Sequence, residues 1–244
     1  MSFPNIIHIN ADEAFNEYTV ERYPVGSFAV AEDGRGFRFA EVGATALVIN
    51  DMIQGEAPSA DTQTEVIGTL AAGVTILTGV GATTNPVVVN ALKYGYIHTD
   101  NATTLPLSRI KSNSAIAAGS TGTVTLFDPT RQAIAAANTV SYYKNLWRDV
   151  IQGVVTTPTA LPAGVARLAA AAAGFCWLQT KGPASVSYDT ATTAIAAVGD
   201  PVQMGVAAGA VGGIPTVGIT QIVGHLMGMV EADTESVVIF LCID

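Results

Sequence analysis

Charged side chains are scarce in this sequence, and cations are scarcer than anions. Asp, Glu, Lys and Arg make up 13% of the 244 residues, whereas soluble domains usually contain roughly 25%. The 11 Lys and Arg residues face 20 Asp and Glu residues, which gives a formal net charge of −9. Nucleic-acid binding depends on clustered cations that displace counterions from phosphates, so we expect no nucleic-acid partner. With so little charge to cover a surface, the chain should be unusually compact or partly buried against other subunits.

Apolar runs long enough to cross a membrane are also lacking. The longest stretch without Asp, Glu, Lys or Arg, residues 201–230, is interrupted by glycines, a proline, a glutamine and a histidine, which predicts strands and turns. The N-terminus has no basic region before an apolar core, so we expect no signal peptide, no membrane partner and a protein that stays where it is made. The two cysteines, Cys176 and Cys242, form no CxxC pair, and we expect buried thiols rather than a disulfide.

Sequence signatures of catalysis are missing as well. The three histidines, at positions 8, 98 and 225, each stand alone, and there is no HExxH motif, no paired Cys/His spacing and no Gly-Lys dipeptide of a phosphate-binding loop. Residues 34–36 begin like a dinucleotide-binding fingerprint, but Phe39 replaces the required third glycine, and a hairpin explains these glycines better. We therefore expect a protein that is not an enzyme and holds no metal or cofactor.

Two groups of residues leave a carbohydrate-binding module or a glycosidase open as alternatives. Adjacent carboxylates occur at positions 32–33 and in an acidic stretch at 231–235, and glycosidases need only two acids. The aromatic rings of Trp147 and Trp177 offer a sugar-stacking platform, although core anchors are the commoner use of tryptophan. We expect the carboxylates to lie in solvated turns.

The local pattern predicts an all-β protein. The 24 glycines and 11 prolines punctuate short segments rich in Val and Thr. A hairpin is expected from strands at 25–30 and 37–40 with a turn at 32–36 that contains Asp-Gly. Strands are also expected at 174–180, 201–206 and 218–229. The continuously apolar run 237–243 predicts a strand that is buried on both faces.

Between residues 58 and 147 the pattern of apolar segments and turns changes, which suggests an insertion with its own core. Seven short strands are expected there, at 66–70, 74–77, 86–89, 95–98, 107–110, 121–127 and 140–143, with a turn at 79–81. Residues 131–138 are compatible with a short helix. We predict an all-β fold of two β-barrel or β-sandwich subdomains with short helices and an extended N-terminal arm. The arm is 1–24, the main domain combines 25–60 with 150–244, and the inserted subdomain is 61–149.

The N-terminal arm alternates large apolar residues before an acidic stretch at 12–18 that is compatible with a helix. An arm of this composition usually needs another surface to hold it. We predict that it makes contacts between subunits or with a larger assembly. The residues expected to make such contacts are Phe3, Ile6, Ile7, Phe15, Tyr18 and, outside the arm, Trp147.

Ten short segments are informative in chain order, at residues 23–27, 33–38, 43–44, 54–58, 95–97, 109–112, 125–129, 174–180, 182–184 and 199–202. Together they resemble structural proteins encoded in the virion gene blocks of tailed bacteriophages. Such proteins are often head decoration (cement) proteins, which implies binding to the major capsid protein on the outer head surface, often as homotrimers. The resemblance implies no catalytic residues. It also implies synthesis in the host cytoplasm and assembly into the virion.

Two other functional hypotheses remain as alternatives to a decoration protein. One is a tail, fibre or spike component that binds a receptor or a carbohydrate through Trp147 or Trp177. The other is a plain β domain with an unknown partner. A cement protein acts through binding energy, since buried apolar area holds the shell together, and the low charge of this chain suits that role.

Overall fold

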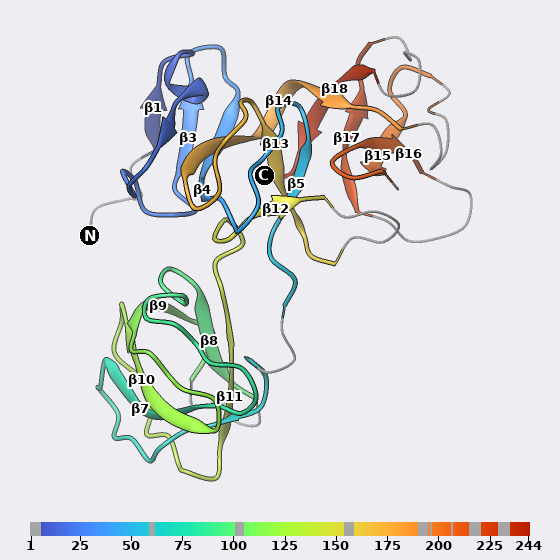
Figure 1. Ribbon diagram of the computed structural model, residues 1–244. Helices are drawn as coiled ribbons and strands as arrows, with labels where there is room; N and C mark the ends of the chain where they lie inside the picture. The colour runs from blue at the N-terminus through green and yellow to red at the C-terminus, as the bar shows by residue number, and fades with distance from the viewer. Residues whose placement is uncertain are drawn as a thin grey trace. The chain divides into compact units, whose positions relative to one another are not determined.

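The chain divides into two compact units in the computed structural model (Figure 1). Unit 1 comprises Met1–Ala57 and Leu146–Asp244, and unit 2 comprises Pro58–Asn145. The structure describes residues 6–58, 62–100, 105–153, 159–189, 195, 197–205, 207–214, 221–228 and 235–244. The expected boundaries, at 60/61 and 149/150, lie within four residues of these limits.

The architecture is all-β, as predicted. The N-terminal segment contains the 3-10 turn η1 (Glu13–Phe15). No helix in the described part of the chain has the length and hydropathy that a membrane span requires. The strands of unit 1 are β1 (Ile7–Ile9), β2 (Glu17–Tyr18), β3 (Phe28–Ala31), β4 (Gly36–Glu41), β5 (Met52–Gln54), β12 (Ile151–Gln152), β13 (Pro162–Ala166), β14 (Phe175–Ser187), β15 (Pro201–Met204), β16 (Val211–Gly213), β17 (Ile222–Leu226) and β18 (Ser236–Cys242). Those of unit 2 are β6 (Glu65–Val66), β7 (Ile76–Ala82), β8 (Tyr96–Thr99), β9 (Ser108–Asn113), β10 (Ser120–Leu126) and β11 (Thr139–Tyr143).

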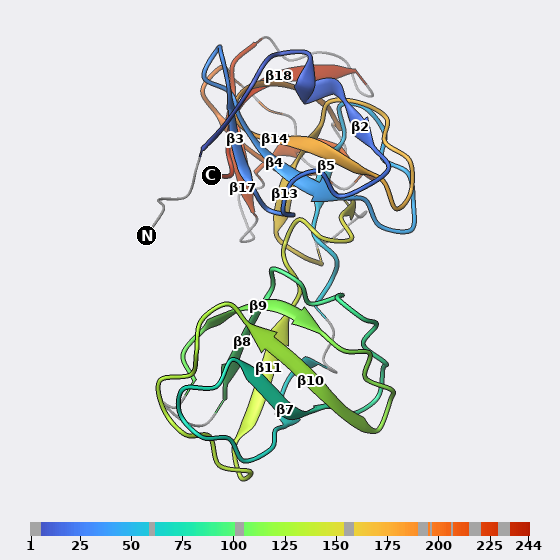
Figure 2. The same cartoon turned by 90° about the vertical axis from the view of Figure 1, so that its left-hand side faces the viewer.

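Unit 2 is a nearly closed six-stranded barrel with strand order β6-β11-β8-β9-β10-β7 (Figures 1 and 2). Five of its strands each contribute a fully buried apolar side chain to the interior, namely Leu77, Ile97, Ile110, Val124 and Val140. The two ends of the sheet approach each other, since the Gly68 N–H donates to the Thr78 carbonyl at 3.0 Å. The buried Glu65 carboxylate adds to this closure by accepting hydrogen bonds from the amide and hydroxyl of Thr83, both at 2.9 Å. Closure removes the exposed sheet edges that favour aggregation.

Unit 1 is organised around β14, a strand of 13 residues. Its first half pairs with β4 on one edge and with β2 and β13 on the other, and its second half pairs with β18 (Figure 2). The path β1-β3-β4-β14-β18-β17-β15-β16 is completed by β2, β5, β12 and β13. A register shift between Gln179 and Lys181, followed by Gly182 with φ +86°, bends the strand where its partners change. One strand thus joins the two halves of the unit.

Two apolar cores lie along this strand. Cys176 and Leu178, from its first half, belong to a core shared with β4, β5 and β13. Ala184 and Val186, from its second half, belong to a core shared with β15, β17 and β18. Both halves of unit 1 therefore depend on β14 for their packing.

Strand β18 alternates between the two faces of the sheet, which corrects the expectation that both of its faces are buried. Val237, Ile239 and Leu241 are no more than 1% exposed, whereas Val238 and Phe240 are 43% and 40% exposed. Cys242 lies in the same outward register and is exposed, so the prediction of a buried thiol holds for Cys176 alone. A run that is apolar on both faces conceals the period-2 pattern that normally separates core from surface.

The predictions for the insertion need three further corrections. The turn expected at 79–81 lies inside β7, which continues through a register shift opposite Gly122 and Thr123 of β10. Residues 131–138 form no helix, because the backbone groups of Ile134 bond to Leu70 in both directions at 2.8 Å. The segment 86–89 makes an isolated bridge between Val87 and Ile116 in place of a strand.

Gly224 of β17 supports a close backbone contact that no other residue allows. A Cβ atom at this position would lie 2.2 Å from the Phe240 carbonyl oxygen of β18. We expect Gly224→Ala to destabilise unit 1 by about 2 kcal/mol, because β17 and β18 must move apart. Tryptophan fluorescence during urea unfolding measures this, since both tryptophans, Trp147 and Trp177, lie in unit 1.

Gly228→Ala is the matched control, because its Cβ would meet nothing nearer than the Val238 Cβ at 3.7 Å. This variant should unfold within about 0.5 kcal/mol of the parent protein. Equal losses of stability in the two variants would contradict the steric explanation.

Candidate interaction surface

The predicted N-terminal arm folds onto unit 1 over its described part. Ile7 of β1 is half-buried and pairs in parallel with Ala29 of β3. Ile6 remains 53% exposed, and Phe3 lies outside the described residues. Phe15 of η1 is 45% exposed, and the Arg167 guanidinium carbon lies 5.7 Å from the centre of its ring. The surface that holds this segment is thus its own unit, and Ile6 and Phe15 stay accessible at its outside.

Tyr18 points toward the interior of unit 1. Its ring centre lies 5.8 Å from that of the buried Phe39, and its hydroxyl donates to the Glu13 carboxylate at 3.3 Å. The Tyr23 hydroxyl donates to the same carboxylate oxygen at 2.8 Å. Burial raises the pKa of Tyr18, and the hydrogen bond to Glu13 raises the pKa of Tyr23. Both hydroxyl bonds lie within the segment, and the two rings hold it on unit 1 by packing against Phe39.

Trp147 contacts Ala163 of β13 and Arg38 of β4. Its indole N–H donates to the Ala163 carbonyl at 2.9 Å, and the Arg38 guanidinium carbon lies 4.7 Å from its ring centre. The same guanidinium lies 4.9 Å from the Phe28 ring centre and donates to both carboxylate oxygens of Asp244 at 2.9 Å. This bidentate pair holds Arg38 against the indole. No local pattern predicts this stack, because Arg38 lies 109 residues before Trp147 and 206 residues before Asp244 in the chain.

Trp177 is fully buried, which confirms the favoured interpretation of a core anchor and rules out the alternative of a sugar-stacking platform at this residue. Its ring centre lies 5.0 Å from that of Phe39 and 5.2 Å from that of Tyr23. Phe175 stacks on Phe39 at 5.8 Å, which extends the cluster along β14. The cluster accounts for Trp177 as a core anchor.

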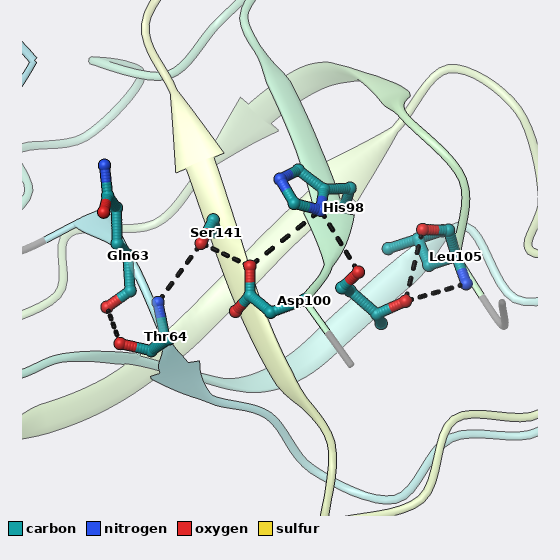
Figure 3. Close-up of polar contacts among 7 residues, drawn as sticks. Gln63, Thr64, His98, Asp100, Leu105 and Ser141 are labelled. Carbon is teal, nitrogen blue, oxygen red and sulfur yellow. Dashed lines mark hydrogen bonds and ion pairs between the residues drawn. The ribbon is translucent and has the colours of Figure 1, made fainter. Parts of the chain in front are cut away.

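A polar cluster in unit 2 contains a serine, a histidine and an aspartate (Figure 3). The Ser141 hydroxyl donates to the Asp100 carboxylate at 2.5 Å and accepts from the Thr64 N–H at 3.2 Å. His98 Nδ1 lies 3.1 Å from the Thr99 carbonyl and 3.9 Å from the Asp100 carboxylate. In a nucleophilic triad the imidazole lies between the serine and the carboxylate and accepts the serine proton. Here the carboxylate takes the middle position, so the cluster links strand ends and does not activate Ser141.

The other titratable candidates are dispersed. His8 and His225 are exposed on β1 and β17, and Glu32 is exposed in the hairpin turn. Asp33 in the same turn pairs with Arg35 at 2.6 Å. Positions 231–234 lie outside the described residues. Within the described part of the chain, no group of three or more His, Cys, Asp or Glu side chains is placed to hold a metal ion.

The two thiols differ in their surroundings. Cys176 is buried in unit 1, and this burial raises the pKa of its thiol to about 12. Cys242 is exposed on the outer face of β18 and pairs in register with Lys181 of β14. Both thiols are free.

Asp51 is a buried carboxyl group that the sequence did not single out. It lies directly before β5 and is 5% exposed. It accepts hydrogen bonds from Ser187 at the end of β14, at 3.1 Å, and from Gln152 of β12. Burial raises the pKa of Asp51 in spite of these two donors. The carboxyl group therefore links three strands of unit 1, and its ionisation lowers the stability of the folded state.

No protein-family model, curated protein or solved structure matches this chain.

The raised pKa of Asp51 predicts a pH dependence of stability. An unfolded Asp titrates near pH about 3.9, so the group contributes its full stabilisation below that pH and loses it as the pH rises through the higher folded pKa. We expect Asp51→Asn, which never ionises, to gain stability relative to the parent protein as the pH rises above about 4. Urea unfolding followed by tryptophan fluorescence at several pH values measures the difference.

Ser187→Ala is the control for this prediction. It keeps the carboxyl group and removes one hydrogen bond to it, so its pH dependence should match or exceed that of the parent. Parallel curves for Asp51→Asn and the parent protein would show that Asp51 does not titrate as described.

Proposed function

We propose that this chain is a non-enzymatic structural protein of a tailed-phage virion that binds the outer capsid surface and stabilises the head. In this role its partners are the major capsid protein and further copies of itself, as a homotrimer. It is made in the host cytoplasm and acts on the outer head surface. The segment-by-segment resemblance to virion structural proteins and the all-β fold support the proposal.

The observation that carries the proposal is an apolar, solvent-exposed sheet face on unit 1. Val238 and Phe240 of β18 and Met227 after β17 are 43%, 40% and 44% exposed. In the register of the sheet, Phe240 lies between Pro183 of β14 and His225 of β17. Exposed apolar side chains gathered on one face of a regular sheet are typical of a protein interaction site. We assign this "Phe240 face" to the capsid contact.

The energetics suit attachment without chemistry. Full burial of one large apolar side chain yields about 1.5–3 kcal/mol, and each copy bound to the assembled shell stabilises that form by mass action. Many copies with modest individual contacts can therefore hold a shell together. Low charge on the chain limits the desolvation cost of such contacts.

A tail, fibre or spike component that binds carbohydrate receives less support. That reading depended on an open ring at Trp147 or Trp177. Trp177 is buried, and Arg38 lies over Trp147. The capsid contact is therefore the function we favour.

Phe240→Ser tests this proposal by co-sedimentation with expanded phage heads that lack decoration. We expect the parent protein to co-sediment and the variant to bind about tenfold more weakly, because apolar area at the contact is lost. Leu161→Ser is the control, since Leu161 is 62% exposed on unit 1 and lies outside β17 and β18. A parent protein that ignores heads, or equal binding by both variants, would refute the assignment.

A further inference from the structure

Charge is divided unequally between the two units. Unit 2 contains 5 basic and 4 acidic residues, a net charge of +1, whereas unit 1 contains 6 basic and 16 acidic residues, a net charge of −10. Two copies that meet through unit 1 alone bring like charges together, which disfavours association. Contact between unit 2 of one copy and unit 1 of another avoids this repulsion.

In unit 2 the guanidinium of Arg109 packs against two aromatic rings. The Arg109 guanidinium carbon lies 5.3 Å from the Tyr94 ring centre and 5.0 Å from that of Phe127, and the two rings stack at 6.1 Å. Tyr96 of β8 lies opposite Arg109 of β9 in the sheet register. Leu107 precedes the same strand. We call these five residues the Arg109 surface.

The Arg109 surface is exposed to solvent, and its cation has no carboxylate partner among the described residues. Tyr96, Leu107 and Phe127 are 41%, 63% and 43% exposed. Among the described residues, no carboxylate forms an ion pair with Arg109 or with Lys111, which also lies on β9. This includes the carboxylate of the neighbouring Asp128. Arginine and tyrosine are enriched at the energetic centres of protein interfaces. A guanidinium already held over rings loses little freedom when it binds a carboxylate.

The outer side of residues 6–24 has the complementary character. Ile6, Phe15 and Val20 are 53%, 45% and 70% exposed, which gives apolar groups for aromatic rings to cover. The segment contains four carboxylates, at positions 12, 13, 17 and 21, and one arginine, a net charge of −3. Asp12 and Glu17 are exposed. It therefore offers apolar groups that the rings of the Arg109 surface can cover and the carboxylates that this surface lacks.

We propose that the Arg109 surface of one copy binds the N-terminal segment 6–24 of a second copy. The contact joins two different surfaces, so successive copies associate head to tail and form a closed ring where the rotation between them permits. It shares no residue with the Phe240 face, so it goes beyond the proposed capsid contact and is tested independently of it.

Sedimentation equilibrium of the full chain at low and high salt tests this contact. We expect the parent protein to self-associate, and to do so more weakly at high salt because the ion pairs are screened. Arg109→Glu and Phe15→Ser should each weaken self-association about tenfold or more, since each removes one side of the contact. Tryptophan fluorescence unfolding verifies that both variants remain folded.

Mixing the two variants gives the sharper result. A copy with Arg109→Glu keeps an intact segment 6–24, and a copy with Phe15→Ser keeps an intact Arg109 surface. An equimolar mixture should therefore form a heterodimer although each variant alone is monomeric. A contact between identical surfaces gives no such complementation, and a mixture that stays monomeric would overturn the proposal.

Two controls separate this contact from others. Arg131→Glu reverses an exposed cation elsewhere on unit 2 and should leave self-association unchanged. Phe240→Ser should also self-associate normally while losing head binding. A monomeric parent protein, or full association by Arg109→Glu, would refute the Arg109 contact. Loss of head binding by Arg109→Glu with self-association intact would assign the surface to the capsid and also refute it.

Discussion

The continuity of β14 is the constraint on which the rest of unit 1 depends. Its first half anchors the Trp177 and Phe39 cluster and the core around Leu178, and its second half pairs with β18 along seven residues. The bend at Gly182 lets one strand serve both halves of the sheet without a break in the chain. The N-terminal segment, the Arg38 stack and the Phe240 face are each positioned by strands that pair with β14 or lie one strand away from it.

Strands β14 and β18 show how far the sequence predicts this fold. The aromatic stretch 174–180 correctly indicates a strand, but Gly182 and Pro183 are turn residues by composition and conceal its second half. Only the pairing of Pro183 with Phe240 in another part of the chain shows that the strand continues. In β18 the inward and outward residues are equally apolar, so no local pattern distinguishes Ile239 from Phe240. Tertiary pairing decides both cases.

The candidate surfaces were less accessible to sequence reasoning than the fold. The apolar residues of the N-terminal segment were noticed, yet the inward side of Tyr18 and the outward side of Phe15 differ only through packing on Phe39 and β14. The Arg109 surface joins side chains between positions 94 and 127, which no spacing rule relates. A serine, a histidine and an aspartate do meet in unit 2, but their order in space removes the chemistry that their identities suggest.

The contrast between the two thiols gives the molecule a chemical reporter of its own. Cys176 is buried and protonated well above neutral pH, so it resists alkylation. Cys242 lies on the same outward register as Val238 and Phe240. A thiol-specific reagent applied to the unmodified protein therefore labels one position, at the edge of the face assigned to the capsid. Protection of that single sulfur on assembled heads would footprint the contact without any substitution in the chain.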